Sequence, residues 1–291
     1  MVSIRKIKVY LVNNYDLMYI FLEVTNFLNG NFLEGKVALV TGAGSGFGRE
    51  MAIAFASKDA NLVLNDINIK NIEETRDIIL KSYNVEILLA QADISNFDQV
   101  KKMRKEVFEK FDNIFVLVNN AGIRMSTFSL VTKEEDFDKI INVNVKGAWN
   151  VTKAFYRKMS KQDFKPIAGK IINIASCAGT EVGANPYIGI YSVSKAALIS
   201  FTKLWALELG SSNITVNAIS PGLFLTPMYK NNPEFIREFM KKRNIKLPLD
   251  RIGEPKQVAD VALFLASPAS DYITGHNIIL DGGMTVSVNT L

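Results

Sequence analysis

Apolar and polar residues follow two repeating patterns along the chain from residue 36 onward. Short runs of consecutive apolar residues are typical of strands buried on both faces of a parallel sheet, whereas apolar residues that recur every three to four positions indicate helices. The two patterns alternate without interruption. They predict strands at 37–40, 61–65, 86–92, 114–118, 170–174, 214–218 and 277–280, and helices at 49–57, 70–82, 96–111, 133–160, from about 191, and at 255–264.

Strict alternation of strands and helices favours parallel pairing, with right-handed connections that place helices on both faces of the sheet. The expected fold class is therefore α/β, a single doubly wound, Rossmann-like parallel sheet. Residues 35–291 are expected to form this domain, with a substrate lid at about 227–249, because no linker or repeat interrupts them. Residues 1–34 are predicted to be an N-terminal extension of uncertain order, whose apolar stretch at 17–22 is too short for a secretory signal.

The composition narrows the possible classes of function. Of the 291 residues, 48% are hydrophobic and 22% are charged, which is ordinary for a globular enzyme. The net charge of +5 is spread along the chain, so we expect no nucleic-acid partner, and the cluster Lys241, Lys242 and Arg243 is interpreted as a solvated helix face. No apolar run is long enough to span a membrane, and the cytoplasm is the expected location.

Cysteine and histidine each occur once, as Cys177 and His276. A lone cysteine excludes an internal disulfide and a cysteine-rich zinc site, and a lone histidine argues against a histidine-based triad or a histidine-rich metal site. We therefore expect no metal. The candidate catalysts that remain are tyrosine, lysine, serine and the carboxylates.

A glycine-rich loop, with Gly42, Gly46 and Gly48, follows the first predicted strand and precedes the first helix. Glycines at such a junction let the backbone approach a pyrophosphate, whose charge the N-terminus of the helix stabilises. The loop therefore predicts a dinucleotide site.

Asp66 ends the second predicted strand, where a carboxylate would accept hydrogen bonds from the adenosine ribose and repel a 2′-phosphate. An NADP site would favour a basic residue at position 45 or 67, and this chain has Ser45 and Ile67 there. The predicted cofactor is therefore NAD. Asp66 could also be a turn residue that faces solvent.

Tyr191 and Lys195 lie four residues apart in a segment with a helical pattern, so both side chains are expected on one face of the helix. A free phenol has a pKa of about 10, which is too high for acid/base work near neutrality. A cation one turn away favours the phenolate and lowers the pKa. This pair is the candidate acid/base centre.

Five motifs occur in a fixed order: Thr41-Gly42-x3-Gly46-x-Gly48, Asn119-Asn120-Ala121-Gly122, Ser176, Tyr191-x3-Lys195 and Pro221-Gly222-x3-Thr226. Over about 36–285 the chain resembles the single-domain branch of the short-chain dehydrogenase/reductase family. The separation of Ser176 from Tyr191 is about two residues longer than is usual there, and the extra length falls in a Gly/Asn/Pro loop at 180–186. The resemblance implies a small-molecule alcohol or ketone substrate and a homo-oligomer, either a dimer or a tetramer.

The resemblance also implies roles for single residues. Tyr191 would be the general acid/base, and Ser176 would hydrogen-bond the substrate oxygen. Lys195 would bind the nicotinamide ribose, and Asn144 would hold a water that leads to this lysine, with Asn142 as the neighbouring alternative. The implied cofactor contacts are Gly42, Ser45, Gly46, Phe47, Gly48, Asp66, Asp93, Ile94, Asn120, Tyr191, Lys195, Phe224 and Thr226. An apolar wall of the substrate pocket is expected from Met228, Tyr229, Phe235, Phe239 and Met240, with Tyr187 beside it.

These observations predict an NAD(H)-dependent oxidoreductase that interconverts a secondary alcohol and a ketone by hydride transfer. The alternative is an NADPH-dependent reductase of 3-oxoacyl thioesters, for which Lys241, Lys242 and Arg243 could contact an acidic carrier protein. A non-catalytic dinucleotide-binding sensor or scaffold is a third interpretation, disfavoured because all four expected catalytic residues are present. Sugars, steroids and cyclic diols all remain open as substrates, since neither fold nor catalytic residues determine the substrate.

Overall fold

Parallel strands form one seven-stranded sheet in the computed structural model, which describes residues 30–180, 188–229, 232–242, 245 and 247–287. The strand order is β3-β2-β1-β4-β5-β6-β7. This doubly wound arrangement confirms the predicted fold class. The strands are β1 (Val37–Thr41), β2 (Asn61–Asp66), β3 (Ile87–Gln91), β4 (Val116–Asn119), β5 (Gly169–Ile174), β6 (Ile214–Pro221) and β7 (Asn277–Leu280).

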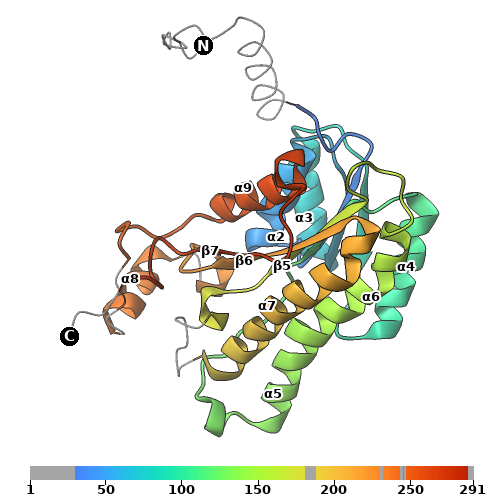
Figure 1. Ribbon diagram of the computed structural model, residues 1–291. Helices are drawn as coiled ribbons and strands as arrows, with labels where there is room; N and C mark the ends of the chain where they lie inside the picture. Colours follow the sequence, from blue (N-terminus) through green and yellow to red (C-terminus); the bar gives the residue numbers. More distant parts are fainter. Residues whose placement is uncertain (1–29, 181–187, 230–231, 243–244, 246, 288–291) are drawn as a thin grey trace, which may run out of the picture.

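Helices cover both faces of the sheet (Figure 1). One face packs against α2 (Gly46–Ala56), α3 (Ile69–Leu80) and α9 (Pro255–Ala266). The other face packs against α4 (Phe97–Lys110), α6 (Ala148–Met159) and α7 (Gly189–Leu209). Two shorter helices, α5 (Glu134–Ile141) and α8 (Pro233–Lys242), lie beyond the carboxyl ends of the strands and flank the region of the site described below.

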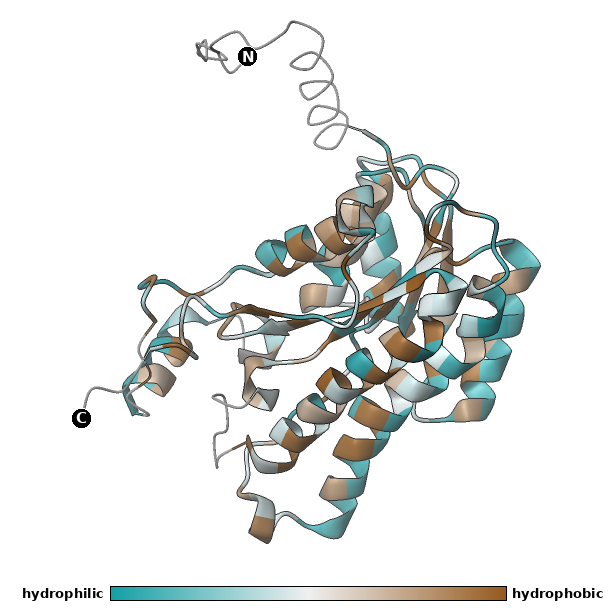
Figure 2. Cartoon of the chain, viewed as in Figure 1, coloured by the Kyte–Doolittle hydropathy of each residue, from teal (hydrophilic) through white to brown (hydrophobic). Residues whose placement is uncertain are grey.

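Most strand residues are apolar because each face of the sheet meets a helical layer, although β5 and β6 also bury polar side chains such as Lys170 and Asn217. In β1, Leu39 belongs to the core shared with α4, α6 and α7, whereas Ala38 and Val40 belong to the core shared with α2, α3 and α9. Successive side chains of a strand point to opposite faces, so burial on both sides favours a continuous apolar run. Figure 2 shows the strands mainly in brown and the outward surface of α4 mainly in teal.

The N-termini of several helices carry side-chain caps, which explains why their predicted starts lie within two residues of the observed ones. The Asn68 side chain accepts from Lys70 N, and the Asn96 side chain accepts from the backbone N–H groups at 98 and 99. Helix α9 begins with Pro255 and a reciprocal capping box between Glu254 and Gln257. Such caps satisfy backbone donors that have no partner within the helix.

The helix predicted at 133–160 is interrupted. A π-helix, Asn142–Gly147, lies between α5 and α6. Gly147 packs so closely on Ile94 that an added Cβ would lie 2.6 Å from Ile94 Cδ1. Isolated π-helical turns often mark functional positions, and this one contains Asn144. The continuous polar and apolar pattern gave no sign of it.

Several expected segments lie outside the described residues. They are 1–29 of the predicted extension, 181–187 with Tyr187 and most of the long loop, and 230–231, 243–244 and 246 within the predicted lid. Near the start of the described chain, Leu33 is fully buried and donates its backbone N–H to Lys58 O at 3.1 Å. Within the described ranges, no helix has both the length and the apolar character needed to cross a membrane.

Candidate active site

A cavity of about 840 Å³ opens at the carboxyl ends of the strands. The strand order reverses between the adjacent strands β1 and β4, and open α/β sheets bind ligands at such a switch point. The cavity is lined by Gly42, Ser45, Gly46 and Phe47 after β1 and by residues 120–124 after β4. Its volume lies within the range of about 300–1,000 Å³ that is common for cofactor and small-molecule sites.

The backbone conformation and close packing of the glycine loop require glycine at several positions. Gly42 and Gly46 have φ values of 64° and 52°, which residues with a side chain rarely adopt. Gly48 is buried at the base of the loop, where an added Cβ would lie 2.1 Å from Gly42 O. Helix α2 begins at Gly46, so its N-terminus faces the cavity and favours an anion there. These residues fit a bound dinucleotide.

The loop after β4 holds the glycine loop in place. The Asn120 side chain donates to Thr41 O at 2.8 Å and to Gly42 O at 3.1 Å. The Thr41 hydroxyl accepts from the backbone N–H of Asn120 and of Ala121 at 3.0 and 3.1 Å. Asn120, one of the implied cofactor contacts, therefore fixes the two loops against each other.

At the far end of the cavity, Asp66 is held by two backbone donors. Its Oδ2 accepts from Gly44 N at 3.1 Å, and its Oδ1 accepts from Asn68 N at 3.0 Å. Asp93 and Ile94 line the same cavity. The Asp66 carboxylate is thus fixed in the cavity wall, and its contact with an adenosine ribose stays a prediction.

Tyr191 and Lys195 both line the cavity from α7, one helical turn apart, and the Lys195 ammonium lies 5.7 Å from the centre of the Tyr191 ring. Ser176, two residues past the end of β5, lines the cavity as well. Its Oγ accepts a hydrogen bond from Ala178 N at 3.2 Å, and its side chain also hydrogen-bonds Cys177. One strand end and one helix face therefore bring these three groups together.

Burial lowers the pKa of Lys195 from 10.5 to about 8. Its ammonium donates to Ile174 O at 2.8 Å. Gly122 lies against the same group, since an added Cβ would stand 3.3 Å from Lys195 Nζ and 3.2 Å from Asn144 Oδ1. The Lys195 ammonium thus contacts a backbone carbonyl, and the lysine also lines the cavity.

Asn144 is buried and does not line the cavity, whereas its neighbour Asn142 does. The Asn144 side chain accepts from Ile123 N at 2.8 Å and donates to Ile123 O and Ser194 Oγ, both at 2.9 Å. It thus ties the loop after β4 to α7. The implied water-holding role of Asn144 stays a prediction.

The cavity brings together Tyr191, Lys195, Ser176 and all the predicted cofactor contacts except Gly48. Phe224 and Thr226 complete this set, and the Phe224 ring stands edge-on to Phe47 with centroids 5.4 Å apart. Of the expected apolar wall, Met228 and Phe239 line the cavity. The chemical roles of these residues stay predictions.

Sequence reasoning missed other cavity residues, among them Cys177, Arg124 and Met284. Cys177 directly follows Ser176, Arg124 lies two residues past Gly122, and Met284 lies four residues past the end of β7, so proximity to the end of a strand was the available signal. Burial and the nearby Asp281 raise the pKa of Cys177 to about 11, so this residue is a thiol and not a thiolate near neutrality. The Arg124 guanidinium lies 5.7 Å from the centre of the Phe239 ring.

A family model described as enoyl-(acyl carrier protein) reductase matches residues 42–285, most of the chain. The chain belongs to the short-chain dehydrogenase/reductase family. This membership makes it an oxidoreductase that uses a nicotinamide dinucleotide, and it confirms the resemblance carried by the motifs.

Curated and structural relatives agree with this family. The 3-oxoacyl-[acyl-carrier-protein] reductase FabG of Thermotoga maritima is 42% identical, with 87% of this chain and 99% of the relative aligned. A short-chain dehydrogenase/reductase from Mycobacterium marinum has a TM-score of 0.82 and 32% identity over 90% of this chain and 100% of its own. A 3-oxoacyl-[acyl-carrier protein] reductase with bound NAD from Brucella melitensis has a TM-score of 0.78 and 28% identity over 97% and 99%.

Proposed function

We propose that this short-chain dehydrogenase/reductase reduces the 3-oxo group of an acyl thioester to a hydroxyl, with NADH as the preferred cofactor. The names of the relatives favour the 3-oxoacyl thioester over the broader class of secondary alcohols that the motifs alone suggested. The observation that carries the proposal is the single cavity that joins the glycine loop to Tyr191, Lys195 and Ser176.

The preference for NADH rests on Asp66, which keeps a negative charge at the adenosine end of the cavity. The cavity wall at positions 45 and 67 is serine and isoleucine, so it offers no cation for a 2′-phosphate there. The Brucella relative, described with bound NAD, shows that a protein of that name can hold this cofactor.

The chain's own groups would divide the proton chemistry between them. The bound dinucleotide would supply the hydride. Tyr191 would give its phenolic proton to the carbonyl oxygen, while the Ser176 hydroxyl would hydrogen-bond that oxygen as its charge develops. The Lys195 ammonium, desolvated and close to the Tyr191 ring, would stabilise the phenolate that remains.

Purified protein supplied with acetoacetyl-CoA and either NADH or NADPH tests the proposal through the loss of absorbance of the reduced cofactor. We expect turnover with both, and a higher kcat/KM with NADH. Replacing Asp66 by Ser and Ile67 by Arg should reverse the preference. Oxidation of simple secondary alcohols without any turnover of the thioester would overturn the substrate, and a wild-type preference for NADPH would overturn the cofactor.

A further inference from the structure

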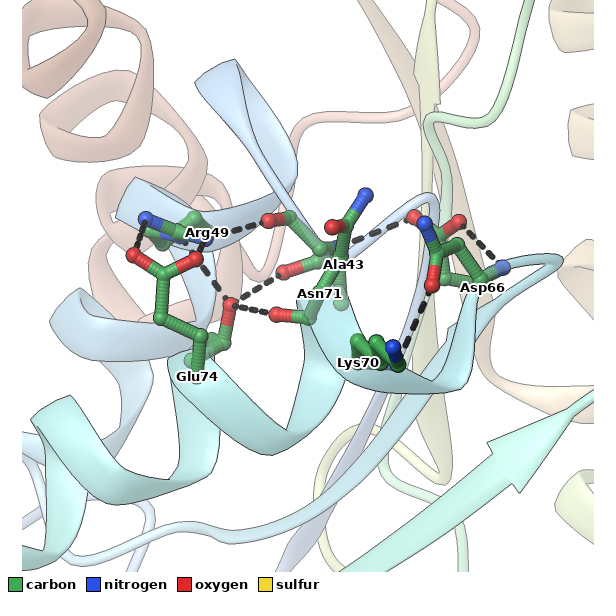
Figure 3. Close-up of polar contacts among 9 residues, drawn as sticks. Ala43, Arg49, Asp66, Lys70, Asn71 and Glu74 are labelled. Atoms are coloured by element: carbon green, nitrogen blue, oxygen red, sulfur yellow. Dashed lines mark hydrogen bonds and ion pairs between the residues drawn. The ribbon is translucent and has the colours of Figure 1, made fainter.

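In the glycine loop, both backbone polar groups of Gly44 are hydrogen-bonded to side chains. Its N–H donates to Asp66 Oδ2 at 3.1 Å, and its carbonyl accepts from Arg49 Nη2 at 2.6 Å. An added Cβ at position 44 would lie 2.8 Å from Asp66 Oδ2 and 2.5 Å from Asn71 Cβ. Figure 3 shows this part of the loop, at Ala43, between the Arg49 and Asp66 side chains. The backbone of one residue, Gly44, therefore separates the guanidinium from the carboxylate that would face the ribose.

Arg49 is engaged almost completely by helix α3. Its Nη1 and Nη2 donate to the two carboxylate oxygens of Glu74 at 3.0 and 2.9 Å, and its Nε donates to Thr75 Oγ1 at 3.1 Å. With the bond to Gly44 O, four of the five guanidinium N–H donors are used. The hydrogen bond from Arg49 in turn lowers the pKa of Glu74. This is the bidentate geometry that guanidinium and carboxylate prefer.

The same helix holds the loop at a second point. The buried Thr75 hydroxyl donates to Ala43 O at 3.0 Å. Helix α3 thus holds the loop in two ways. Its Thr75 bonds the Ala43 carbonyl directly, and its Glu74 orients the Arg49 side chain that bonds the Gly44 carbonyl. Arg49 is less exposed than its partner, at 21% against 61% for Glu74, so the cation rests against the loop and the carboxylate covers it from solvent.

Behind the glycine loop, the balance of charge beside the cavity depends on Glu74. Asp66 and Glu74 each contribute one negative charge, and Arg49 contributes one positive charge. A 2′-phosphate would add between one and two more negative charges at this place. Without Glu74, Arg49 would offset Asp66 and would have donors free in the bidentate geometry that binds phosphate.

We infer that Glu74 is a specificity-determining residue, which excludes the 2′-phosphate of NADPH by occupying and neutralising Arg49. The inference rests on the proposed preference for NADH and adds a second residue to Asp66 as its cause. In this arrangement Arg49 positions the Gly44 peptide, and Glu74 decides whether the same cation is available to the cofactor.

The test is the dissociation constant of NADH and of NADPH, measured by quenching of tryptophan fluorescence, for wild type and Glu74→Gln. We expect NADPH to bind about three- to tenfold more tightly to the variant, a gain that salt reduces, and NADH to change less than about twofold. Glu73→Gln is the matched control, because Glu73 lies on the same helix, loses the same charge and forms no ion pair with Arg49. An equal gain from both variants would overturn the inference.

A double-mutant cycle separates specificity from simple loss of structure. In an Arg49→Met background, Glu74→Gln should no longer strengthen NADPH binding, since there is no cation to release. If Glu74→Gln weakens both cofactors equally, its role is structural only and the inference fails. If wild type binds neither cofactor, the proposed function fails, whereas tight NADH binding with no effect of Glu74→Gln defeats the inference alone.

Discussion

Lys195 donates its ammonium proton to the backbone carbonyl of Ile174, the last residue of β5, at 2.8 Å. This hydrogen bond joins α7 to the strand that leads into Ser176, so the candidate acid/base helix and the candidate substrate-binding serine are fixed relative to each other. It is also a buried charge with a neutral partner. Such a group lowers the stability of the cofactor-free protein.

The cost of burying Lys195 should appear as a dependence of stability on pH. Because its pKa is lowered from 10.5 to about 8, the unfolded chain binds more protons than the folded chain between these values. The free energy of unfolding should therefore rise with pH across this window, by about 3 kcal/mol from this residue. Urea unfolding of the cofactor-free protein at several pH values measures it.

Lys195→Met should remove this part of the pH dependence and be more stable than wild type near neutrality. Lys105→Met is the control, since Lys105 is exposed and forms only a surface ion pair with Glu109. A wild-type slope that Lys195→Met leaves unchanged would show that the ammonium is not desolvated in the folded chain.

Tyr191→Phe removes the phenolic proton and should lower kcat about 10²- to 10⁴-fold, the range of general acid catalysis. Binding of NADH should stay within about twofold, because the ring and its packing remain. Steady-state rates with acetoacetyl-CoA and a fluorescence titration with NADH separate the two effects. Tyr156→Phe on α6, whose hydroxyl only accepts from Arg157 Nε, is the control and should keep full activity. Near-normal kcat in Tyr191→Phe would assign the proton transfer to another group.

Gly122→Ala probes the narrow space between Asn144 and Lys195. Its Cβ would lie 3.2 Å from Asn144 Oδ1 and 3.3 Å from Lys195 Nζ, closer than most Cβ contacts, so one of these groups must shift. We expect kcat/KM to fall about tenfold with little change in thermal stability. Gly210→Ala is the matched control, because an added Cβ at position 210 meets no atom within 4 Å. Equal activity of the two variants would show that the position of the lysine tolerates displacement.

The sequence was a reliable guide to the sheet and to the residues that line the cavity. Continuous apolar runs such as the one that contains Leu39 have only one stable placement, between two helical layers, and parallel strands bring the residues that follow them to one edge. Ser176, Tyr191 and Asp66 therefore meet at that edge although they are far apart along the chain.

What the pattern missed depends on contacts between segments that are distant in sequence. The π-helix containing Asn144 is associated with the close approach of Gly147 to Ile94 and with hydrogen bonds to Ile123, none of which affects the local periodicity. The ion pair between Arg49 and Glu74 likewise could not be predicted from the sequence. The two residues lie on different helices, and only the packing of α2 against α3 brings them together.

The exposed lysines of α8 allow a test for a carrier protein as the source of the thioester. Lys241 and Lys242 end the helix whose Phe239 lines the cavity, so an acidic partner bound there would be close to the site. Replacing both by Glu should raise KM for a 3-oxoacyl carrier protein about tenfold, more at low salt, because charges at the edge of an interface mainly govern encounter.

A small neutral substrate, the acetoacetyl thioester of N-acetylcysteamine, should be reduced at the same rate by the lysine variant and by wild type. The matched control reverses the charge of Lys101 and Lys102 on α4, which pair with Asp98 and Glu106. If the α8 lysine variant lost equal activity with the carrier thioester and with the neutral thioester, the substitutions would be acting on the cavity wall and not on a bound carrier protein. Loss confined to the carrier thioester, and only in the α8 variant, would make this helix the docking element for an acidic protein and explain why a basic cluster stands beside an apolar cavity.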